Sequence, residues 1–212
     1  MLWKGINMND VYILAVESSC DDTSIAIVKN GKECIAMSIS SQIDDHNKFG
    51  GVEPEIASRM HCENILYVLE DCLSQTNLKI EDMDAIAVTY KPGLLGSLLV
   101  GLEFAKTVAA VYNKPLIGVN HLIGHIYANN IEDNLEFPLL ALVVSGGHTE
   151  LSIMHNNYEF ELLGTTLDDA IGESFDKVAR VLGFPYPGGP SIEKASLLGK
   201  NTYNLTTFSY TN

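Results

Sequence analysis

The stretch ILAVESSCDDTSIAIV (13–28) joins an apolar run, a turn of small polar residues and a second run rich in β-branched residues. This order predicts a strand, a turn and a second strand. The same order returns at LLALVVSGGHTELSIM (139–154), where the turn again contains a serine and the following run again begins at a threonine. The repeat predicts an α/β protein built from two related lobes.

The residues after the first copy extend the pattern to a complete lobe. Asn30-Gly31 is a signal for a two-residue hairpin turn, and it leads into a third strand over 33–40. We expect a helix over 55–76, a strand over 84–90, a helix over 98–112 and a strand over 115–119. The apolar stripe expected on the first helix consists of Ile56, Met60, Ile65, Leu66, Leu69 and Leu73.

The second copy begins in the same way and is shorter. A third strand is expected over 158–163, then a helix reaching Leu182 with Thr166 or Asp168 as its N-cap. A further helix is expected within GGPSIEKASLLG (188–199), preceded by its two glycines. We therefore expect an N-terminal extension at 1–10, a first lobe at 11–137 and a partial second lobe at 138–212, about one third short of a finished fold.

Composition narrows the class of protein. The chain has 212 residues, of which 46% are hydrophobic and 19% charged, typical of a folded globular protein. Its longest apolar runs fall far short of the roughly 20 residues that span a bilayer. Four cysteines without a CxxC pair, and no secretory signal, favour a cytoplasmic location. The net charge of −14 argues against a chain that holds nucleic acid through bulk electrostatics.

The segment NHLIGH (120–125) places two histidines four residues apart behind an asparagine suited to capping a helix. On a helix, His121 and His125 would share one face and could reach the same metal ion. The pair alone leaves open whether it is a metal site or two histidines that lie close by chance. It is not the HExxH site of a zinc protease, because Leu122 stands where the general base is needed.

Several glycine-rich turns are candidates for binding phosphate. SGGH (145–148) and the glycines of YPGGPSI (186–192) would let a backbone approach an anion, although tight turns need the same residues. KPGLLGS (91–97) does not fit the P-loop pattern, and close helix packing explains its glycines equally well. Four carboxylates are expected along one helix, either as a solvated face or as ribose ligands: Asp168, Asp169, Glu173 and Asp176.

Six stretches together resemble the bacterial TsaD type of the tRNA N6-adenosine threonylcarbamoyltransferase family, formerly called O-sialoglycoprotein endopeptidases or glycoproteases. Each stretch is weak evidence alone, but the order and spacing of the six match the family along roughly residues 11–195. Val143 and Val144 stand where archaeal members have a tyrosine before SGG, which points to the bacterial branch. The six are ESSCDDTSIAI, GGVEPEIASRMH, PGLLGSLLVGLEFAK, NHLIGH, LVVSGGHTEL and LDDAIGESFDKVARVLGFPYPGGPSI.

The resemblance implies an ASKHA fold (actin, hexokinase and Hsp70-like) with duplicated RNase H-like lobes. It implies transfer of the threonylcarbamoyl group from threonylcarbamoyl-AMP to N6 of the adenosine at position 37 in ANN-decoding tRNAs. His121 and His125 resemble two ligands of a catalytic Fe²⁺ or Zn²⁺, and Mg²⁺ could accompany the nucleotide. Substrate contacts are implied for Val144, Ser145, Gly146, Gly147, His148, Asp176, Gly189 and Glu193, and the N-lobe phosphate hairpin for Glu17, Ser18, Ser19, Cys20 and Thr23.

Two departures from the family pattern matter. Members continue for roughly another hundred residues, including a GGV-A-N stretch over the nucleotide and a late aspartate that completes the metal site. We therefore expect a partial member with impaired activity of its own. The resemblance also implies a TsaB-type paralogue and a TsaE-type ATPase as partners, and no membrane. The alternatives are a non-catalytic nucleotide-binding module and an ASKHA kinase, which would have no use for NHLIGH.

Overall fold

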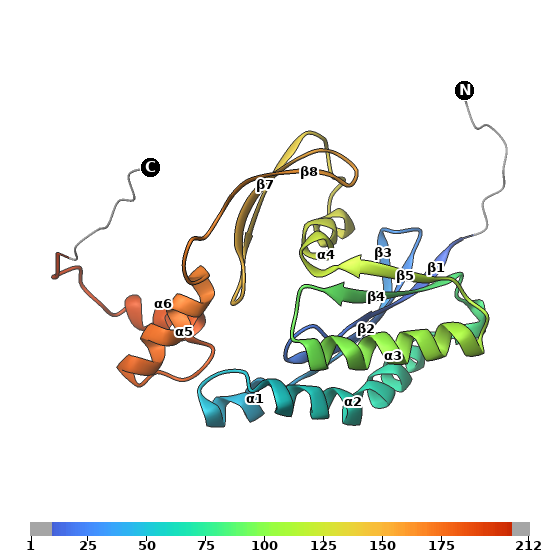
Figure 1. Cartoon of the computed structure of the whole chain (residues 1–212), viewed down its shortest axis with the longest axis horizontal. Coiled ribbons are helices and arrows are strands. Elements are labelled where there is room, and N and C mark those ends of the chain that lie inside the picture. Colours follow the sequence, from blue (N-terminus) through green and yellow to red (C-terminus); the bar gives the residue numbers. More distant parts are fainter. Residues whose placement is uncertain (1–9, 205–212) are drawn as a thin grey trace.

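The computed structural model describes residues 10–204, so the expected extension at 1–10 lies, apart from Asp10, outside the described residues. A five-stranded sheet forms the first half of the chain (Figure 1). Its strand order is β3-β2-β1-β4-β5, with β1, β2 and β3 antiparallel and β4 and β5 parallel to β1. The strands are β1 (Tyr12–Glu17), β2 (Asp22–Lys29), β3 (Glu33–Ser41), β4 (Ala85–Lys91) and β5 (Leu116–Asn120).

Two long helices, α2 (Pro54–Ser74) and α3 (Leu95–Val111), pack on one face of this sheet (Figure 1). Apolar side chains of β1, β2 and β4 meet those of the two helices in one buried core. The shorter helices are α1 (Ile43–His46) and α4 (His121–Ala128), with 3₁₀ turns at Asn47–Phe49, Ile80–Asp82 and Asn129–Ile131. The order of strands and long helices expected for this half is therefore confirmed, with α3 beginning three residues early.

One local expectation in this half was wrong, and another was right only in part, because Ile65 and Leu69 of the stripe expected on α2 are buried. The β2–β3 connection has three residues rather than two, because Lys29 pairs with Glu33; Asn30 and Gly31 do adopt the positive φ that the turn requires. The stripe expected on α2 is also rotated, and Leu66 is 59% exposed. The buried face instead carries Ala57, His61, Ile65, Val68, Leu69 and Cys72.

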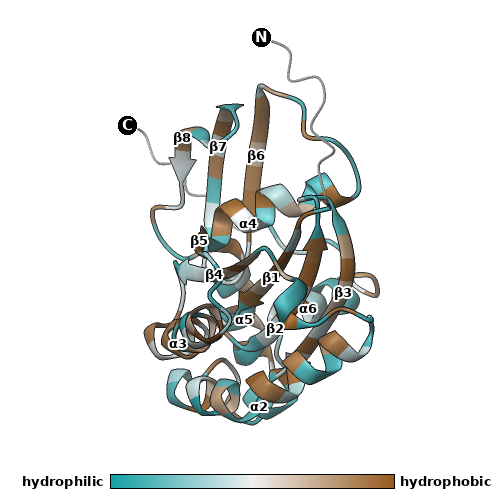
Figure 2. Cartoon of the chain, turned by 90° about the vertical axis from the view of Figure 1, so that its right-hand side faces the viewer, coloured by the Kyte–Doolittle hydropathy of each residue, from teal (hydrophilic) through white to brown (hydrophobic). Residues whose placement is uncertain are grey.

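The second half contains a three-stranded antiparallel sheet in the order β6-β7-β8, followed by two helices. Its elements are β6 (Leu139–Val144), β7 (Thr149–Asn156), β8 (Glu159–Thr165), α5 (Ile171–Leu182) and α6 (Gly188–Ser196). Within the described residues, β6 pairs only with β7, whereas its counterpart β1 pairs on both edges. Figure 2 shows β6 as hydrophobic along most of its length, and Leu142 is 65% exposed.

The starts of both C-terminal helices differ from expectation. Helix α5 begins at Ile171, and neither Thr166 nor Asp168 caps it. Thr166 instead donates to the carbonyl of Asp169 and accepts from the amide of Asp168, so these carboxylates lie in a turn before the helix. Helix α6 begins at Gly188 itself rather than after the two glycines, and a Cβ at Gly188 would lie 2.5 Å from the carbonyl of Phe175, so the close contact with α5 requires glycine there. Across residues 10–204, none of the helices is both long and apolar enough to cross a membrane.

Candidate metal and nucleotide site

The parallel strands of the first sheet bring the candidate residues to one edge. Glu17 ends β1 and Asn120 ends β5, with β4 between the two strands. The carboxyl ends of parallel strands meet at the same edge, which is where ligands bind in open α/β sheets. The turn that follows β1 and the helix that follows β5 therefore face each other, although 102 residues separate Ser19 from His121.

Helix α4 presents the two histidines together. They occupy positions i and i+4, and their Nε2 atoms lie 3.0 Å apart. The Asn120 side chain accepts hydrogen bonds from the amides of Leu122 and Ile123 at 2.9 and 3.2 Å, so it caps the helix as expected from the sequence. The cap fixes the first turn of the helix, and with it the position of His121.

Replacing Asn120 with alanine should lower the free energy of unfolding by about 1 kcal/mol, because two helix amides lose their acceptor. Urea titration followed by circular dichroism measures this change. Asn129→Ala is the matched control, since its amide donates to carbonyls at the other end of the same helix. An Asn120 variant no less stable than the Asn129 variant would contradict the capping role.

A half-buried carboxylate orients the first histidine. Glu17 Oε2 lies 3.1 Å from His121 Nδ1, and Glu17 also accepts from the Ser19 amide and the Thr89 hydroxyl. Burial raises the pKa of Glu17, but the hydrogen bonds from His121, Ser19 and Thr89 outweigh it and bring the pKa to about 2. The carboxylate is therefore ionised at neutral pH and accepts the Nδ1–H of His121, which leaves the Nε2 lone pair facing His125.

The donor set fits a metal in part. A tetrahedral Zn²⁺ with bonds of about 2.0–2.1 Å holds two nitrogens about 3.3 Å apart, close to the spacing of this pair. A histidine that binds a metal commonly donates its other ring N–H to a carboxylate. Glu17 occupies that position beside His121. Burial and the neighbouring His121 lower the pKa of His125, which favours the neutral form that binds metals. Among residues 10–204, however, three such ligands nowhere come together.

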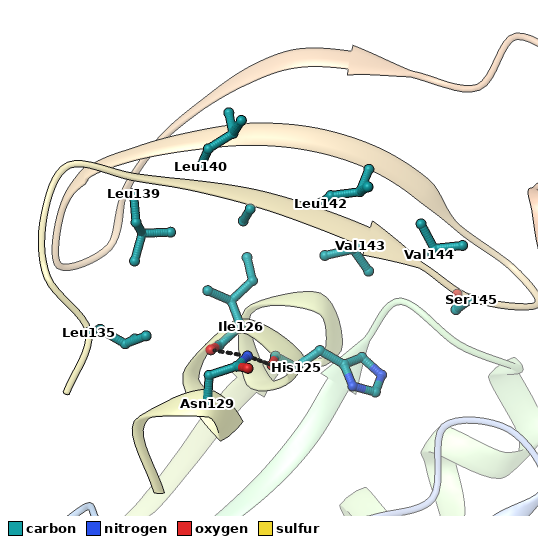
Figure 3. Close-up of a pocket in the computed structure, with 11 residues that line it drawn as sticks. His125, Ile126, Asn129, Leu135, Leu139, Leu140, Leu142, Val143, Val144 and Ser145 are labelled. Carbon is teal, nitrogen blue, oxygen red and sulfur yellow. Dashed lines mark hydrogen bonds between the residues drawn. The ribbon is translucent and has the colours of Figure 1, made fainter. Parts of the chain in front are cut away.

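An apolar cavity of about 540 Å³ adjoins the pair (Figure 3). His125 and Ile126 of α4, with Asn129 just after the helix, form one wall, and β6 with Ser145 forms the other. In Figure 3, Leu139 and Val143 point toward the helix, whereas Leu140 and Leu142 point away from it. His125 and Ser145 both line the cavity, so one residue from each of the two candidate groups borders the same space.

The turn after β1 is held by donors from several segments. The carbonyls of Ser19, Cys20 and Asp21 accept from the Leu94 amide at 2.8 Å, from His61 at 2.9 Å and from the Gln42 amide at 3.1 Å. The glycines of KPGLLGS serve close packing here, because a Cβ at Gly93 would lie 2.5 Å from the Ser19 carbonyl. Of the two interpretations of these glycines, the structure supports close packing.

The SGG turn is held in a related way in the second half. The Ser145 carbonyl accepts from the amide of Gly172 at 3.2 Å, and a Cβ at Gly172 would lie 2.6 Å from that oxygen. Ser145 Oγ accepts from the amide of His148 at 3.0 Å. Val144 to His148 therefore form a tight turn against the start of α5, and a Cβ at Gly146 or Gly147 would have nothing within 4 Å.

The remaining candidates cluster at α5 and α6. Asp176 Oδ1 accepts from the Gly188 amide at 2.7 Å, so this carboxylate joins the two helices. Gly189 and Glu193 lie on α6, with open space around the Gly189 Cα. The expected acidic face is broken up, because Lys177 pairs with Asp169 at 2.7 Å and Glu173 at 3.1 Å. A second hollow of about 170 Å³ contains Asp176 and Arg180 from α5 and Asn47 and Gly50 from the first half.

Comparison with known proteins identifies the family. The family "tRNA N6-adenosine threonylcarbamoyltransferase", TsaD, matches residues 33–211. The chain belongs to the TsaD family. The curated family member of Bacillus subtilis is 54% identical over 92% of this chain, and that of Ligilactobacillus salivarius 52% identical over 94%. The chain spans 57% and 58% of the length of these two relatives.

Among solved structures, YeaZ from Pseudomonas aeruginosa superposes with a TM-score of 0.50 at 17% identity, covering 73% of this chain and 64% of that one. At this identity the likeness bears on the fold alone. Together with the strand order, it confirms the ASKHA-type α/β fold expected from the TsaD resemblance.

Two residues that support the candidate site were missed in the sequence. The hydroxyl of Thr89, in β4, donates to Glu17, and His61 of α2 contacts the turn after β1. Thr89 carries no sequence signal, because a threonine in an apolar strand is ordinary. His61 does carry one, since it stands four residues before the buried Ile65 and so belongs to the same helix face.

Proposed function

We propose that this TsaD-family chain contributes the histidine pair and nucleotide turns for threonylcarbamoyl transfer to tRNA. The reaction moves the threonylcarbamoyl group from threonylcarbamoyl-AMP to N6 of adenosine 37 in ANN-decoding tRNAs. The observation that carries the proposal is the contact of the two Nε2 atoms at 3.0 Å, with the ionised Glu17 on the far nitrogen of His121. This arrangement has no use in a sugar or acid kinase of the same fold.

In this proposal, different segments bind the phosphate, the ribose and the carbamoyl end of threonylcarbamoyl-AMP. The Ser18–Asp22 turn and the Val144–His148 turn supply hydroxyls and backbone amides for the phosphate. Asp176 Oδ1 holds the start of α6, which leaves Oδ2 to accept from a ribose hydroxyl, and Gly189 and Glu193 of α6 would contact the nucleotide. His125 lines the same cavity as Ser145, and His121 contacts His125, so the pair would hold the carbamoyl end of the donor.

The two histidines would hold one divalent ion, Fe²⁺ or Zn²⁺, with Mg²⁺ a further candidate beside the nucleotide phosphate. Such an ion acts as a Lewis acid, polarising the carbamoyl carbonyl and stabilising charge in the transition state. The protein's own contribution is orientation: Glu17 fixes the tautomer of His121, and Asn120 fixes the helix that carries both rings. A ligand from outside the described residues would complete the coordination.

The partners in this proposal are tRNA, a TsaB-type paralogue and a TsaE-type ATPase. The net charge of −14 supports a need for partners, because the chain lacks an excess of basic groups for phosphate. Exposed apolar side chains on the outer side of α2 and α3 offer a surface for a helical partner. They include Leu66, Tyr67, Leu95, Leu99 and Val111.

The test compares the chain with a variant carrying both His121→Ala and His125→Ala. Cobalt absorption should show binding by the original chain and about a hundredfold loss in the variant, because both imidazole ligands are gone. Transfer of labelled threonylcarbamate to a tRNA transcript is measured in parallel, with the TsaB-type and TsaE-type partners present. His155→Ala, which removes an exposed histidine paired only with Glu161, is the control.

The outcomes separate the candidate functions. Cobalt binding and transfer that both depend on the pair support the transferase. Nucleotide binding by a folded chain without metal binding or transfer would favour a non-catalytic nucleotide-binding module. Equal cobalt binding by the double variant and the original chain would contradict the assignment of the pair.

A further inference from the structure

Two histidines outside the pair, His46 and His61, are fully buried, and His61 holds the turn after β1. His61 of α2 has no exposed surface, and its two ring nitrogens contact the turn and the strand that follows it. Nδ1 lies 2.7 Å from Thr23 Oγ1, and Nε2 lies 2.9 Å from the carbonyl of Cys20. The imidazole therefore bridges the start of β2 and the middle of the turn.

The two contacts fix the protonation of the ring. A carbonyl oxygen can only accept, so His61 Nε2 must carry a proton and donate to Cys20. Nδ1 is then unprotonated and accepts the hydroxyl proton of Thr23. Burial lowers the pKa of His61, which agrees with a neutral ring at neutral pH. A single tautomer satisfies every polar atom of the bridge.

The internal repeat shows that the threonine is an anchoring point in both halves. Thr23 and Thr149 hold equivalent places in the two repeated stretches, as do Ser19 and Ser145. Thr149 Oγ1 accepts from the amide of Ile171 at 2.9 Å, at the start of the next helix. In the first half no helix begins there, and the imidazole of His61 takes over that anchoring role.

We propose that His61 is a positioning residue that holds the Ser18–Asp22 turn in the conformation that lets Ser19 and Glu17 orient His121. Ser19, in the turn that His61 holds, contacts both residues directly: its Oγ lies 3.2 Å from His121 Nδ1, and its amide donates to Glu17. The functional value of this positioning, the orientation of His121, rests on the proposed function. His61 lies on α2, outside the cavity, and is nevertheless required for the geometry of the site.

The first test is the position of the turn itself, measured without substrate. The amides of Leu94 and Gln42 donate to the carbonyls on either side of Cys20, at Ser19 and Asp21. In His61→Phe, hydrogen exchange of these two amides should accelerate about tenfold or more, because the Cys20 carbonyl loses its donor and the turn is released. Ile65→Ala is the control, since it removes buried side chain one helical turn away without touching the turn.

Two further variants keep the test informative if His61→Phe folds poorly. His61→Gln retains an amide that can donate to Cys20 and should restore much of the protection. Thr23→Val removes the other contact of His61 and should accelerate hydrogen exchange of the same two amides. In a chain that carries both Thr23→Val and His61→Phe, the acceleration should be less than the two single effects combined. Nitrogen chemical shifts of the original chain should show one neutral tautomer with the proton on Nε2.

Adenosine monophosphate binding, measured by calorimetry on the same variants, tests the connection to function. Exchange that accelerates in His61→Phe but not in Ile65→Ala, with at least about tenfold weaker nucleotide binding, supports the whole inference. Accelerated exchange in a series that never binds nucleotide supports the positioning role and contradicts the proposed function. Exchange equal in His61→Phe and Ile65→Ala would overturn the positioning role.

Discussion

Replacing Glu17 with glutamine should weaken cobalt or zinc binding by the histidine pair about ten- to hundredfold. The carboxylate accepts the Nδ1–H of His121 and so keeps that proton away from the Nε2 atom that faces His125. A glutamine amide can donate as well as accept. It would allow the proton of His121 to move to Nε2, where it blocks the metal.

Cobalt titration followed by visible absorption measures the affinity, and circular dichroism verifies that each variant is folded. Glu70→Gln is the matched control, because it removes the same charge from an exposed position on α2. Glu17→Asp is a second comparison: it keeps the charge but shortens the side chain, so it should lose affinity through distance alone.

The two variants separate charge from geometry. Recovery in Glu17→Asp above the level of Glu17→Gln would show that the ionised acceptor matters more than its reach. Affinity within twofold of the original chain in Glu17→Gln, with Glu70→Gln unchanged, would show that the tautomer of His121 is set elsewhere.

The sequence was sufficient to predict the elements that bring the site together. Alternating and β-branched runs predict strands, and the repeat of 13–28 at 139–154 predicts two related halves. Asn120 predicts the start of α4, because a side-chain oxygen before an apolar helix satisfies free amides. The placement of the two histidines on one face follows from that helix alone.

Contacts between distant segments could not be predicted in this way. The buried face of α2 includes Ala57 and His61, which apolar periodicity passes over because one is small and the other polar. Thr166 or Asp168 was expected to cap a helix, but the Thr166 hydroxyl makes hydrogen bonds within the preceding turn. Such residues are placed by their partners, and a single sequence does not reveal which partners meet.

Replacing Gly93 with alanine should lower the free energy of unfolding by about 1–3 kcal/mol and weaken metal binding in the same variant. The added Cβ would lie 2.5 Å from the Ser19 carbonyl and 2.8 Å from the Ser19 Cβ, so either the turn or the loop before α3 must move. Either movement stretches the hydrogen bond from the Leu94 amide to Ser19, which is now 2.8 Å long. Ser19 also contacts His121, so the displacement reaches the pair.

Gly51→Ala is the control, because a Cβ at Gly51 would have nothing within 4 Å. Urea unfolding and cobalt titration on the same samples separate the two effects. A Gly93→Ala chain that loses stability and keeps full cobalt affinity would mean that α4 holds the histidines without help from the turn. Loss of both would place the turn after β1 among the structural requirements of the metal site, because no atom of Gly93 itself lies in that site.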